Sequence, residues 1–399
     1  MGVVTDVRTC ASSQSVREDY LVFGSPRIEE DEINELVATL RSGWLGTGPK
    51  VARFEADFAQ YTGSRNALAL SSCTAGLHLS LLALGIGPDD EVITTPMTFA
   101  ATANAIIHVG AKPVFADIEL PSMNISPDDL EERITVRTKA VIPVHFAGRP
   151  CRMDRIMEIA RRRGLAVIED AAHAVEAWYH GRKVGTIGDL GCFSFYVTKN
   201  IVTGEGGMVT TDNDGYADTI KVYSLHGLSK DAWRRYSDEG FRHYRVIAPG
   251  YKYNMMDIQA AIGIHQLKRV GEYHCRRREI WTRYDEALSD LPMDLPAPQD
   301  PDTVHALHLY TPLLRLRELA CTRDEFQRRL HLMNIGTGIH FTALHTHPYY
   351  AETLGYRPAD FPNALSVSER TISLPLSAKL TDFDVNSVIE AVRRAAGCT

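Results

Sequence analysis

The sequence lacks the cysteine patterns of zinc-binding and extracellular proteins. Its seven cysteines are scattered over 399 residues, and no two of them form a Cys-x-x-Cys pair. This spacing gives no indication of a zinc knuckle or a redox pair. An odd number of dispersed thiols is typical of a reducing compartment rather than of a secreted, disulfide-rich domain. We therefore expect a cytoplasmic protein.

Long hydrophobic runs and an excess of basic residues are also absent. No segment reaches the ~18 consecutive apolar residues of a transmembrane helix, and the first 20 residues lack the apolar core of a signal peptide. With 43 basic and 50 acidic residues the net charge is -7, which gives no basic surface for nucleic acids or anionic membranes. No Gly-x-Gly-x-x-Gly motif follows an early strand, which argues against a nicotinamide cofactor. The expected partners are small molecules, with no nucleic acid and no membrane.

Short apolar runs alternate with helical segments such as 100–109 and 153–163. The expected strands are 66–71, 91–95, 112–117, 140–145, 165–169, 192–196 and 207–211. This alternation predicts an α/β fold, with a mostly parallel sheet between helices in a large domain. We expect a loose tail at 1–18, the large domain at 19–265, and a smaller C-terminal α/β domain at 266–399. A long charged helix is expected to start near His265, at the boundary.

Three motifs place polar groups after predicted strands, where ligands bind in such sheets. The first is the small-residue turn 71–76 (SSCTAG) between a strand and a helix. Free N–H groups at a helix N-terminus, with hydroxyls beside them, suit a phosphate. Capping of the helix by Ser or Thr is the alternative, and this motif alone does not decide between them.

The second motif, 167–173 (VIEDAAH), runs from apolar residues into two acids and a histidine. An acid at the end of a buried strand needs a partner, because burial of an unpaired carboxylate is costly. A protonated pyridine nitrogen is one such partner and would hold Asp170 ionised. A helix N-cap formed by Asp170 is the alternative.

The third motif places Lys199 directly after the aromatic run 191–198, with a glycine-rich segment at 203–207. A lysine can form a Schiff base once desolvation and neighbouring cations lower its pKa. A solvated lysine is the alternative for this position taken singly. The three motifs together supply an anion site, an acid for a ring nitrogen and a reactive amine, which are different needs of one cofactor.

The chain resembles the DegT/StrS-type sugar aminotransferases, which have the aspartate aminotransferase fold (PLP fold type I). The resemblance extends from 43–49 (GWLGTGP) to 373–376 (SLPL). Its central motifs are EDAAH at 169–173, FSFYVTKN at 193–200, TGEGG at 203–207 and GYKYNMMDIQAA at 250–261. The resemblance implies pyridoxal 5'-phosphate (PLP) as the cofactor.

The resemblance also implies roles for single residues. Lys199 would be the Schiff-base lysine and proton shuttle, Asp170 would pair with the pyridine nitrogen, and His173 would lie against the phenolic oxygen. Asn254 would reach the phosphate of the neighbouring subunit, which implies a homodimer with shared active sites. The other implied cofactor contacts are the ring-stacking Phe99 and the phosphate ligands Thr74, Ala75 and Ser194.

The reaction implied is transfer of an amino group from an amino acid, glutamate, to a nucleotide-linked keto sugar. Within the family, the segments 226–233 (HGLSKDAW), 249–254 (PGYKYN) and 335–341 (IGTGIHF) most resemble those of enzymes that aminate C4 of a UDP- or dTDP-linked keto sugar. The candidate substrate contacts are Trp44, Lys252, His340 and His347. Packing or surface solvation is the alternative for these side chains.

Other interpretations of the site carry less weight. The histidines of 340–347 (HFTALHTH) have no nearby acid pair, so we expect a polar loop and no metal. Dehydratases of this fold replace the lysine with histidine, so the presence of Lys199 favours transamination. A non-catalytic regulator would be expected to lose Lys199, Asp170 or the phosphate loop. We expect Glu205 and Cys192 to be structural.

Overall fold

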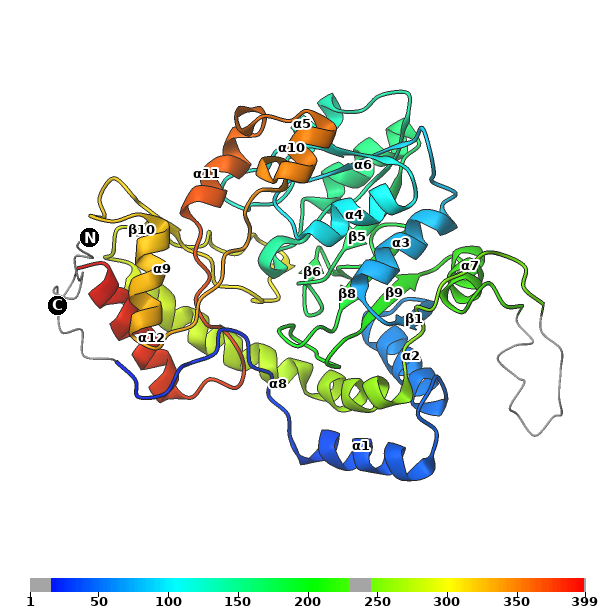
Figure 1. Ribbon diagram of the computed structural model, residues 1–399, viewed down its shortest axis with the longest axis horizontal. Helices are drawn as coiled ribbons and strands as arrows, with labels where there is room; N and C mark the ends of the chain where they lie inside the picture. The colour runs from blue at the N-terminus through cyan, green and yellow to red at the C-terminus, as the bar shows by residue number, and fades with distance from the viewer. Residues whose placement is uncertain (1–15, 230–244, 398–399) are drawn as a thin grey trace, which may run out of the picture.

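The computed structural model describes residues 16–229 and 245–397 (Figure 1). Most of the tail expected at 1–18 therefore lies outside the described residues, as does the 230–233 part of the HGLSKDAW segment. At the end of that tail, Arg17 Nη1 donates to Asp384 Oδ1 over 2.6 Å. The tail thus meets the C-terminal part of the chain where its description begins.

Seven strands form the central sheet, in the order β1-β9-β8-β5-β4-β2-β3. Pairing is parallel from β8 through to β3, and β9 alone runs antiparallel to both of its neighbours. The strands are β1 (Asn66–Leu70), β2 (Glu91–Thr94), β3 (Lys112–Phe115), β4 (Thr138–Val141), β5 (Ala166–Asp170), β8 (Leu190–Ser194) and β9 (Gly207–Thr211). Every residue of β2 and β9 is buried, as expected for strands covered on both faces. The predicted α/β fold with a mostly parallel sheet is confirmed.

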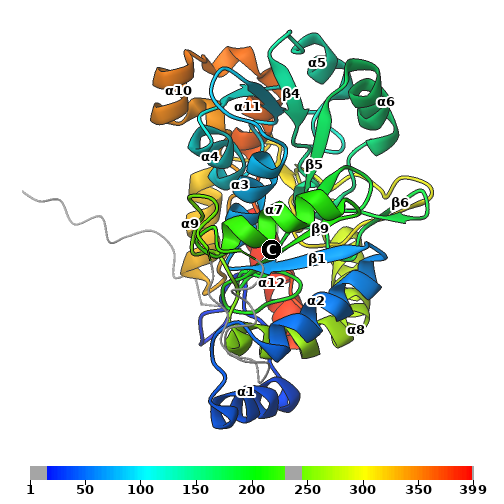
Figure 2. The same cartoon turned by 90° about the vertical axis from the view of Figure 1, so that its right-hand side faces the viewer.

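Helices cover both faces of the sheet. Figure 2 shows β1 between α7 on one side and α2 with α8 on the other. One face packs against Leu77, Ile106 and Ile220 of α3, α4 and α7, and the opposite face packs against Phe58 and Ile264 of α2 and α8. The helices of this part are α1 (Glu30–Ser42), α2 (Pro49–Thr62), α3 (Cys73–Ala83), α4 (Ala100–His108), α5 (Pro127–Glu132), α6 (Met153–Arg163) and α7 (Asp214–Ser224).

The long helix α8 (Asp257–Leu288) begins before the expected start near His265. Its first turns pack against the central sheet, where Ala260 and Ile264 are buried. The Asp257 carboxylate accepts hydrogen bonds from the N–H groups of Gly48 and Val51, which joins α8 to the start of α2. The helix therefore spans the predicted domain boundary, and the boundary itself stays a prediction.

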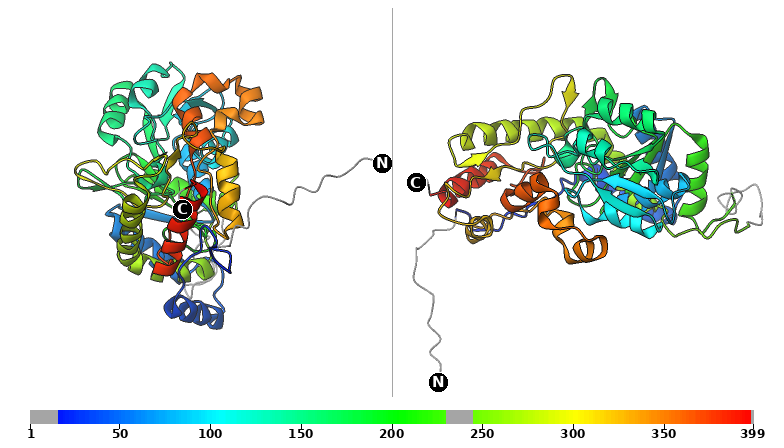
Figure 3. Two further views of the ribbon diagram at one scale, coloured as in Figure 1. Left: turned by 90° about the vertical axis from the view of Figure 1, so that its left-hand side faces the viewer. Right: turned by 90° about the horizontal axis from the view of Figure 1, so that it is seen from above.

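The C-terminal half of α8 packs with a second group of elements into a separate core, around Tyr284, Leu330 and Val388. Figure 3 (right) shows this half of α8 beside α12, which is drawn in red. The helices α9 (Arg323–Leu332) and α12 (Asp382–Ala395) contribute to this core, whereas α10 (Pro348–Leu354) and α11 (Pro362–Arg370) pack in another core with residues of α4 and β3. The short strands are β10 (Met293–Asp294) paired with β12 (Leu313–Leu314), and β11 (Thr303–Val304) paired with β6 (Trp178–Tyr179), which pairs with β7 (Arg182–Lys183). Within the described ranges, none of the helices is long and apolar enough to cross a membrane.

Candidate active site

A cavity of about 530 Å³ lies where the chain leaves the carboxyl ends of β1, β2, β5 and β8. Segments far apart in sequence meet there because parallel strands end at the same edge of the sheet. Seven of the candidate residues line this cavity: Thr74, Phe99, Asp170, His173, Ser194, Lys199 and His340. The structure therefore brings the three sequence motifs together in one space.

Asp170 is the last residue of β5 and is buried at the cavity wall. Burial raises the pKa of its carboxyl, while hydrogen bonds from Thr102 and Ala172 oppose that rise. Thr102 Oγ1 donates to Oδ2 over 2.8 Å, and the Ala172 N–H donates to Oδ1 over 3.2 Å. The chain turns after Asp170 without forming a helix, so the helix N-cap alternative does not describe this residue. The carboxylate is left facing the cavity.

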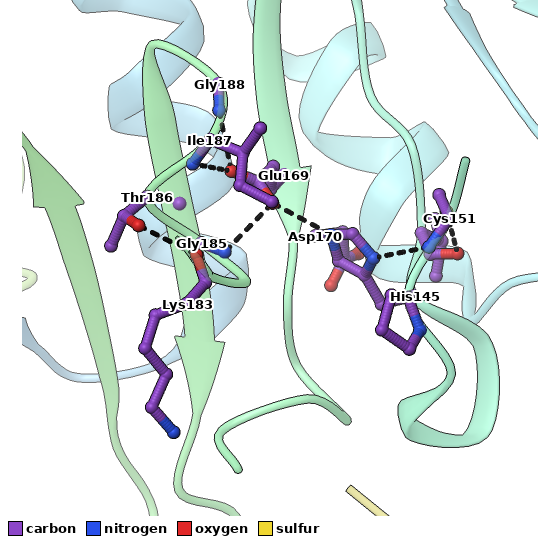
Figure 4. A network of polar contacts seen from close by, with 12 residues as sticks. His145, Cys151, Glu169, Asp170, Lys183, Gly185, Thr186, Ile187 and Gly188 are labelled. Carbon is purple, nitrogen blue, oxygen red and sulfur yellow. Dashed lines mark hydrogen bonds and ion pairs between the residues drawn. The ribbon is translucent and has the colours of Figure 1, made fainter. Parts of the chain in front are cut away.

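The neighbouring Glu169 points to the opposite side of β5, as strand alternation requires, and is fully buried. Figure 4 shows it between the 185–188 loop and the ring of His145. Its carboxylate accepts hydrogen bonds from the N–H groups of Gly185, Ile187 and Gly188 over 2.7 to 2.9 Å. Burial alone would raise the pKa of Glu169, but these donors and His145 lower it below its ordinary value.

The protonation of His145 follows from its two contacts. The Cys151 N–H donates to Nδ1 over 3.0 Å, so Nδ1 carries no proton. Nε2 lies 3.1 Å from Glu169 and must be the donor of that bond. The backbone N–H of His145 also donates to the carbonyl of Asp170 over 3.1 Å. This network holds the end of β5, and with it Asp170, in place.

Lys199 lies in a turn after β8, in which its N–H donates to the carbonyl of Tyr196. Its side chain reaches the cavity. Burial lowers the pKa of the ammonium to about 8, although Cys73 and Asp170 favour the charged form. An amine in this range is partly neutral near physiological pH, which is the condition for a nucleophilic or proton-accepting lysine.

Two histidines share the cavity with Lys199. Burial, together with the charge of Lys199, lowers the pKa of His173 well below its ordinary value and that of His340 to about 4. Both rings are therefore neutral at pH 7. His340 Nδ1 lies 2.7 Å from Ser373 Oγ, whereas His173 Nδ1 is buried and has no hydrogen-bond partner among the described residues. In a neutral ring one nitrogen is a donor and the other is an acceptor.

The end of the cavity next to α3 has the features of an anion site. Ser72 caps the helix, and its Oγ accepts a hydrogen bond of 3.0 Å from the N–H of Ala75. Thr74 and Ser194 line the cavity beside this turn. A Cβ at Gly207 would lie 2.4 Å from the backbone nitrogen of Cys73, so only glycine lets β9 approach the turn this closely. Ala75 does not line the cavity, and its N–H already has the Ser72 hydroxyl as a partner.

Besides Ala75, four candidate residues lie outside the cavity lining. Lys252 Nζ donates to Asn254 Oδ1 over 2.7 Å, and Asn254 Nδ2 donates to Thr47 Oγ1 over 2.6 Å. Trp44 Nε1 donates to the carbonyl of Thr47 over 3.2 Å, so these side chains form one connected group. His347 is exposed, and its ring lies 3.4 Å from the carbonyl of Thr342.

Several residues of the site were not expected from the sequence. Thr102 and Phe341 both line the cavity, and Phe341 stacks on His173 with ring centroids 6.0 Å apart. Behind the cavity, the rings of His173 and His308 lie 4.4 Å apart. A threonine within a helix carries no signal of its own, but Phe341 belongs to the 340–347 segment already noted. No group of three or more His, Cys, Asp or Glu side chains within 16–229 and 245–397 is placed to hold a metal ion.

Comparison with known proteins identifies the family. The sequence profile of the DegT/DnrJ/EryC1/StrS aminotransferase family matches residues 26–393. The chain belongs to this family. The predicted resemblance is confirmed over nearly the whole chain.

Relatives of the family agree with this membership. SpsC of Bacillus subtilis, a spore coat polysaccharide biosynthesis protein, is 52% identical over 378 residues, or 94% of this chain and 97% of SpsC. The PLP form of Spr1654 of Streptococcus pneumoniae, named as a sugar aminotransferase, matches with a TM-score of 0.87 and 32% identity, covering 95% of this chain and 99% of that one. PseC of Helicobacter pylori, an aminotransferase involved in pseudoaminic acid biosynthesis, matches with a TM-score of 0.88 and 27% identity, covering 95% of this chain and 100% of that one.

Proposed function

We propose that this protein transfers the amino group of glutamate to C4 of a nucleotide-linked keto sugar, carried by UDP or dTDP. Its family and structural neighbours make it a PLP-dependent sugar aminotransferase. The observation that carries the site assignment is the Lys199 amine, with its pKa lowered to about 8, in one cavity with the buried Asp170. The similarity to a polysaccharide biosynthesis protein supports a sugar acceptor.

The residues of the cavity fit PLP at each of its polar groups. Asp170 offers a buried carboxylate to the ring nitrogen, neutral His173 offers a donor to the phenolic oxygen, and the α3 turn with Thr74 and Ser194 suits the phosphate. Phe99 is exposed at the cavity, where its ring can cover a flat cofactor. When bound, PLP supplies an electron-withdrawing ring that stabilises negative charge on the carbon that loses a proton.

The chain itself moves the proton and holds the charges. The neutral Nζ of Lys199 would take a proton from the amino acid carbon in the first half of the reaction and pass it to the cofactor carbon that gains the amino group. In the second half it would move a proton from that carbon to the sugar carbon that receives the amino group. Asp170 would keep its negative charge beside a protonated ring nitrogen of PLP, because an opposite charge favours the ionised form. His173 would donate a hydrogen bond from Nε2 to the phenolic oxygen of PLP. Because the lowered pKa keeps the ring neutral, His173 would not protonate that oxygen.

A partner subunit is part of this proposal. Trp44, Lys252 and Asn254 form one connected group outside the cavity lining of their own chain. We assign this group to the neighbouring active site of a homodimer, with Asn254 on the phosphate and Lys252 and Trp44 near the substrate. His340, in the cavity, and His347 are further proposed substrate contacts. A cytoplasmic location stays a prediction, supported by the five described cysteines, which are all free.

The test begins with the absorbance spectrum of the purified protein before and after adding glutamate. Conversion of the visible band of bound PLP to the near-ultraviolet band of the aminated cofactor is expected, and Lys199→Ala is expected to lose turnover by several orders of magnitude. Lys139→Ala, which changes an exposed lysine of β4, is the matched control. Full turnover by Lys199→Ala would rule out the role of Lys199.

The acceptor is identified in the second half of the test. The aminated enzyme is offered UDP- and dTDP-linked sugars with a keto group at C3 or C4, and the products are located by NMR. Recovery of the visible band only with 4-keto sugars is expected. Recovery with 3-keto sugars alone would contradict the assignment of C4.

A further inference from the structure

A network of buried polar side chains extends from the cavity into the protein. Glu176 follows β5, Asn200 directly follows Lys199, and His308 lies in the segment between β11 and β12. Arg277 comes from α8. All four side chains are buried, with relative exposures of 4 to 5%. Burying a polar group is costly unless it is hydrogen-bonded or paired with an opposite charge. The contacts among these side chains therefore favour one specific arrangement.

The orientation of the Asn200 amide is determined by its partners. Nδ2 donates to Glu176 Oε2 over 2.7 Å and to the carbonyl of Ala306 over 2.9 Å, which uses both of its protons. A flipped amide would place oxygen against two acceptors, so the flip is excluded. Oδ1 therefore faces Nδ1 of His308, at 2.8 Å. Because Oδ1 can only accept, Nδ1 of His308 carries the proton.

The His308 ring is also held in the neutral state. Burial lowers its pKa well below the ordinary value, and neighbouring charges lower it further. The titratable and charged groups that face it are His173, Lys199, Arg277 and His340. A neutral ring protonated at Nδ1 leaves Nε2 as a lone pair.

The His308 ring packs against His173, with centroids 4.4 Å apart and planes tilted by 35°. Since Nδ1 of His173 has no hydrogen-bond partner among the described residues, ring packing from His308 and Phe341 determines its orientation. A shift of His308 would therefore turn the His173 ring.

The part of this network farthest from the cavity is an ion pair. Arg277 Nη1 lies 3.6 Å from Glu176 Oε1, and both groups are shielded from solvent. Loss of either partner would leave a buried charge uncompensated. The pair therefore places the Glu176 carboxylate as the acceptor for Asn200.

We propose that His308 is a positioning residue for His173, and that Asn200, oriented by Glu176, holds His308 in its Nδ1-protonated neutral form. The same Asn200 anchors the main chain next to Lys199. The two active-site groups are therefore positioned by one buried arrangement. This inference rests on the proposed function only in that His173 is taken to contact the cofactor.

The first test uses cofactor-free protein and needs no reaction. Nitrogen NMR of the histidine side chains is expected to show His308 neutral and protonated at Nδ1 across pH 6 to 8, with the signal assigned by its loss in His308→Phe. A cationic His308, or one protonated at Nε2, would overturn the proposal.

Two variants of His308 separate its contacts. His308→Asn places an amide N–H where Nδ1 was, so it keeps a donor to Asn200 but loses the ring. His308→Phe keeps a ring against His173 but loses the donor. Both are expected to lower kcat by about 10- to 100-fold with KM for glutamate unchanged within about twofold, since small misplacements of reacting groups have effects of this size. Both should also shift the pH midpoint of the visible band of bound PLP.

The control is His331→Asn, which changes an exposed histidine on α9 and should leave kcat and the spectrum as in wild type. A lower melting temperature with wild-type kcat and spectrum in both His308 variants would show that the role is only structural. If no keto sugar is aminated while the NMR and spectral results hold, the proposed substrate fails and the positioning role stands.

Discussion

Thr102 on α4 donates a hydrogen bond of 2.8 Å to Oδ2 of Asp170 at the end of β5. Thr102 has one hydroxyl proton and gives it to Asp170, so Thr98, whose Oγ1 lies 2.8 Å away, must donate to Thr102 in turn. This pair of hydroxyls opposes the effect of burial on Asp170, which raises the pKa of the carboxyl. Thr102 thus helps to keep Asp170 ionised for its proposed partner, the ring nitrogen.

Replacing Thr102 by valine should weaken catalysis without unfolding the protein. Thr102→Val removes the donor and raises the pKa of Asp170 further, so we expect kcat to fall about tenfold, the usual effect of losing one hydrogen bond to a charged group. Thr102→Ser retains a hydroxyl and should keep most of the activity. Steady-state kinetics on PLP-saturated enzyme measures both. A wild-type kcat in Thr102→Val would show that catalysis does not depend on the hydrogen bond from Thr102 to Asp170.

Binding of PLP to cofactor-free protein should depend on pH through Lys199. Capture requires the neutral amine, so the rate should rise with pH around a midpoint of about 8, the lowered pKa of Lys199. Asp170 favours the ammonium form, so Asp170→Asn should move the midpoint to lower pH. Stopped-flow absorbance at a series of pH values gives both midpoints. A rate that rises only at the pH of an ordinary lysine would contradict the prediction.

Glu169→Gln should destabilise the fold rather than change the chemistry. Whichever way the amide turns, its NH₂ group meets a donor, either His145 with Gly185 or the N–H groups of Ile187 and Gly188. We expect the free energy of unfolding to fall by about 3 kcal/mol, as for other disrupted buried charge networks. Urea unfolding of the cofactor-free protein at pH 7 measures this.

The pH dependence of that difference has a definite sign. The pKa of Glu169 is lower in the folded protein than its ordinary value of 4.5. Its stabilisation is therefore fully present above pH 4.5 and is lost as the pH falls through the folded pKa. The gap between wild type and Glu169→Gln should narrow in acid, and a gap that widens there would contradict the assignment.

Gly207→Ala should disrupt the turn at the start of α3. The added Cβ would meet the backbone of Ser72 and Cys73 at 2.4 Å, where no side chain can move aside. We expect a loss of about 2 kcal/mol in unfolding free energy and weaker PLP binding. Gly271→Ala is the matched control, since a Cβ there meets nothing within 4 Å and alanine favours its helix α8. Unchanged PLP affinity in Gly207→Ala would show that β9 can move away.

The sequence alone predicted the strand pattern and the three motifs at strand ends. Strands and helices can be predicted from the local sequence, because apolar residues repeat with a period of 2 in strands and 3.6 in helices on the face that is buried. The sequence pattern placed the start of α8 too late, near His265 rather than at Asp257. The segment 257–264 (DIQAAIGI) carries a single charged residue, so it lies outside the charged pattern that predicted the helix, and its Ala260 and Ile264 pack against the sheet.

Which side chains meet was decided only by the tertiary structure. Thr102 and Asp170 are separated by 68 positions, and Asn200 and His308 by 108. Nothing in the local pattern of either partner records such a pairing, because a hydrogen bond across this distance depends on how whole strands and helices are placed. The motifs therefore predict which residues are candidates for the active site. The protonation states and orientations of these residues depend on neighbours that only folding brings together.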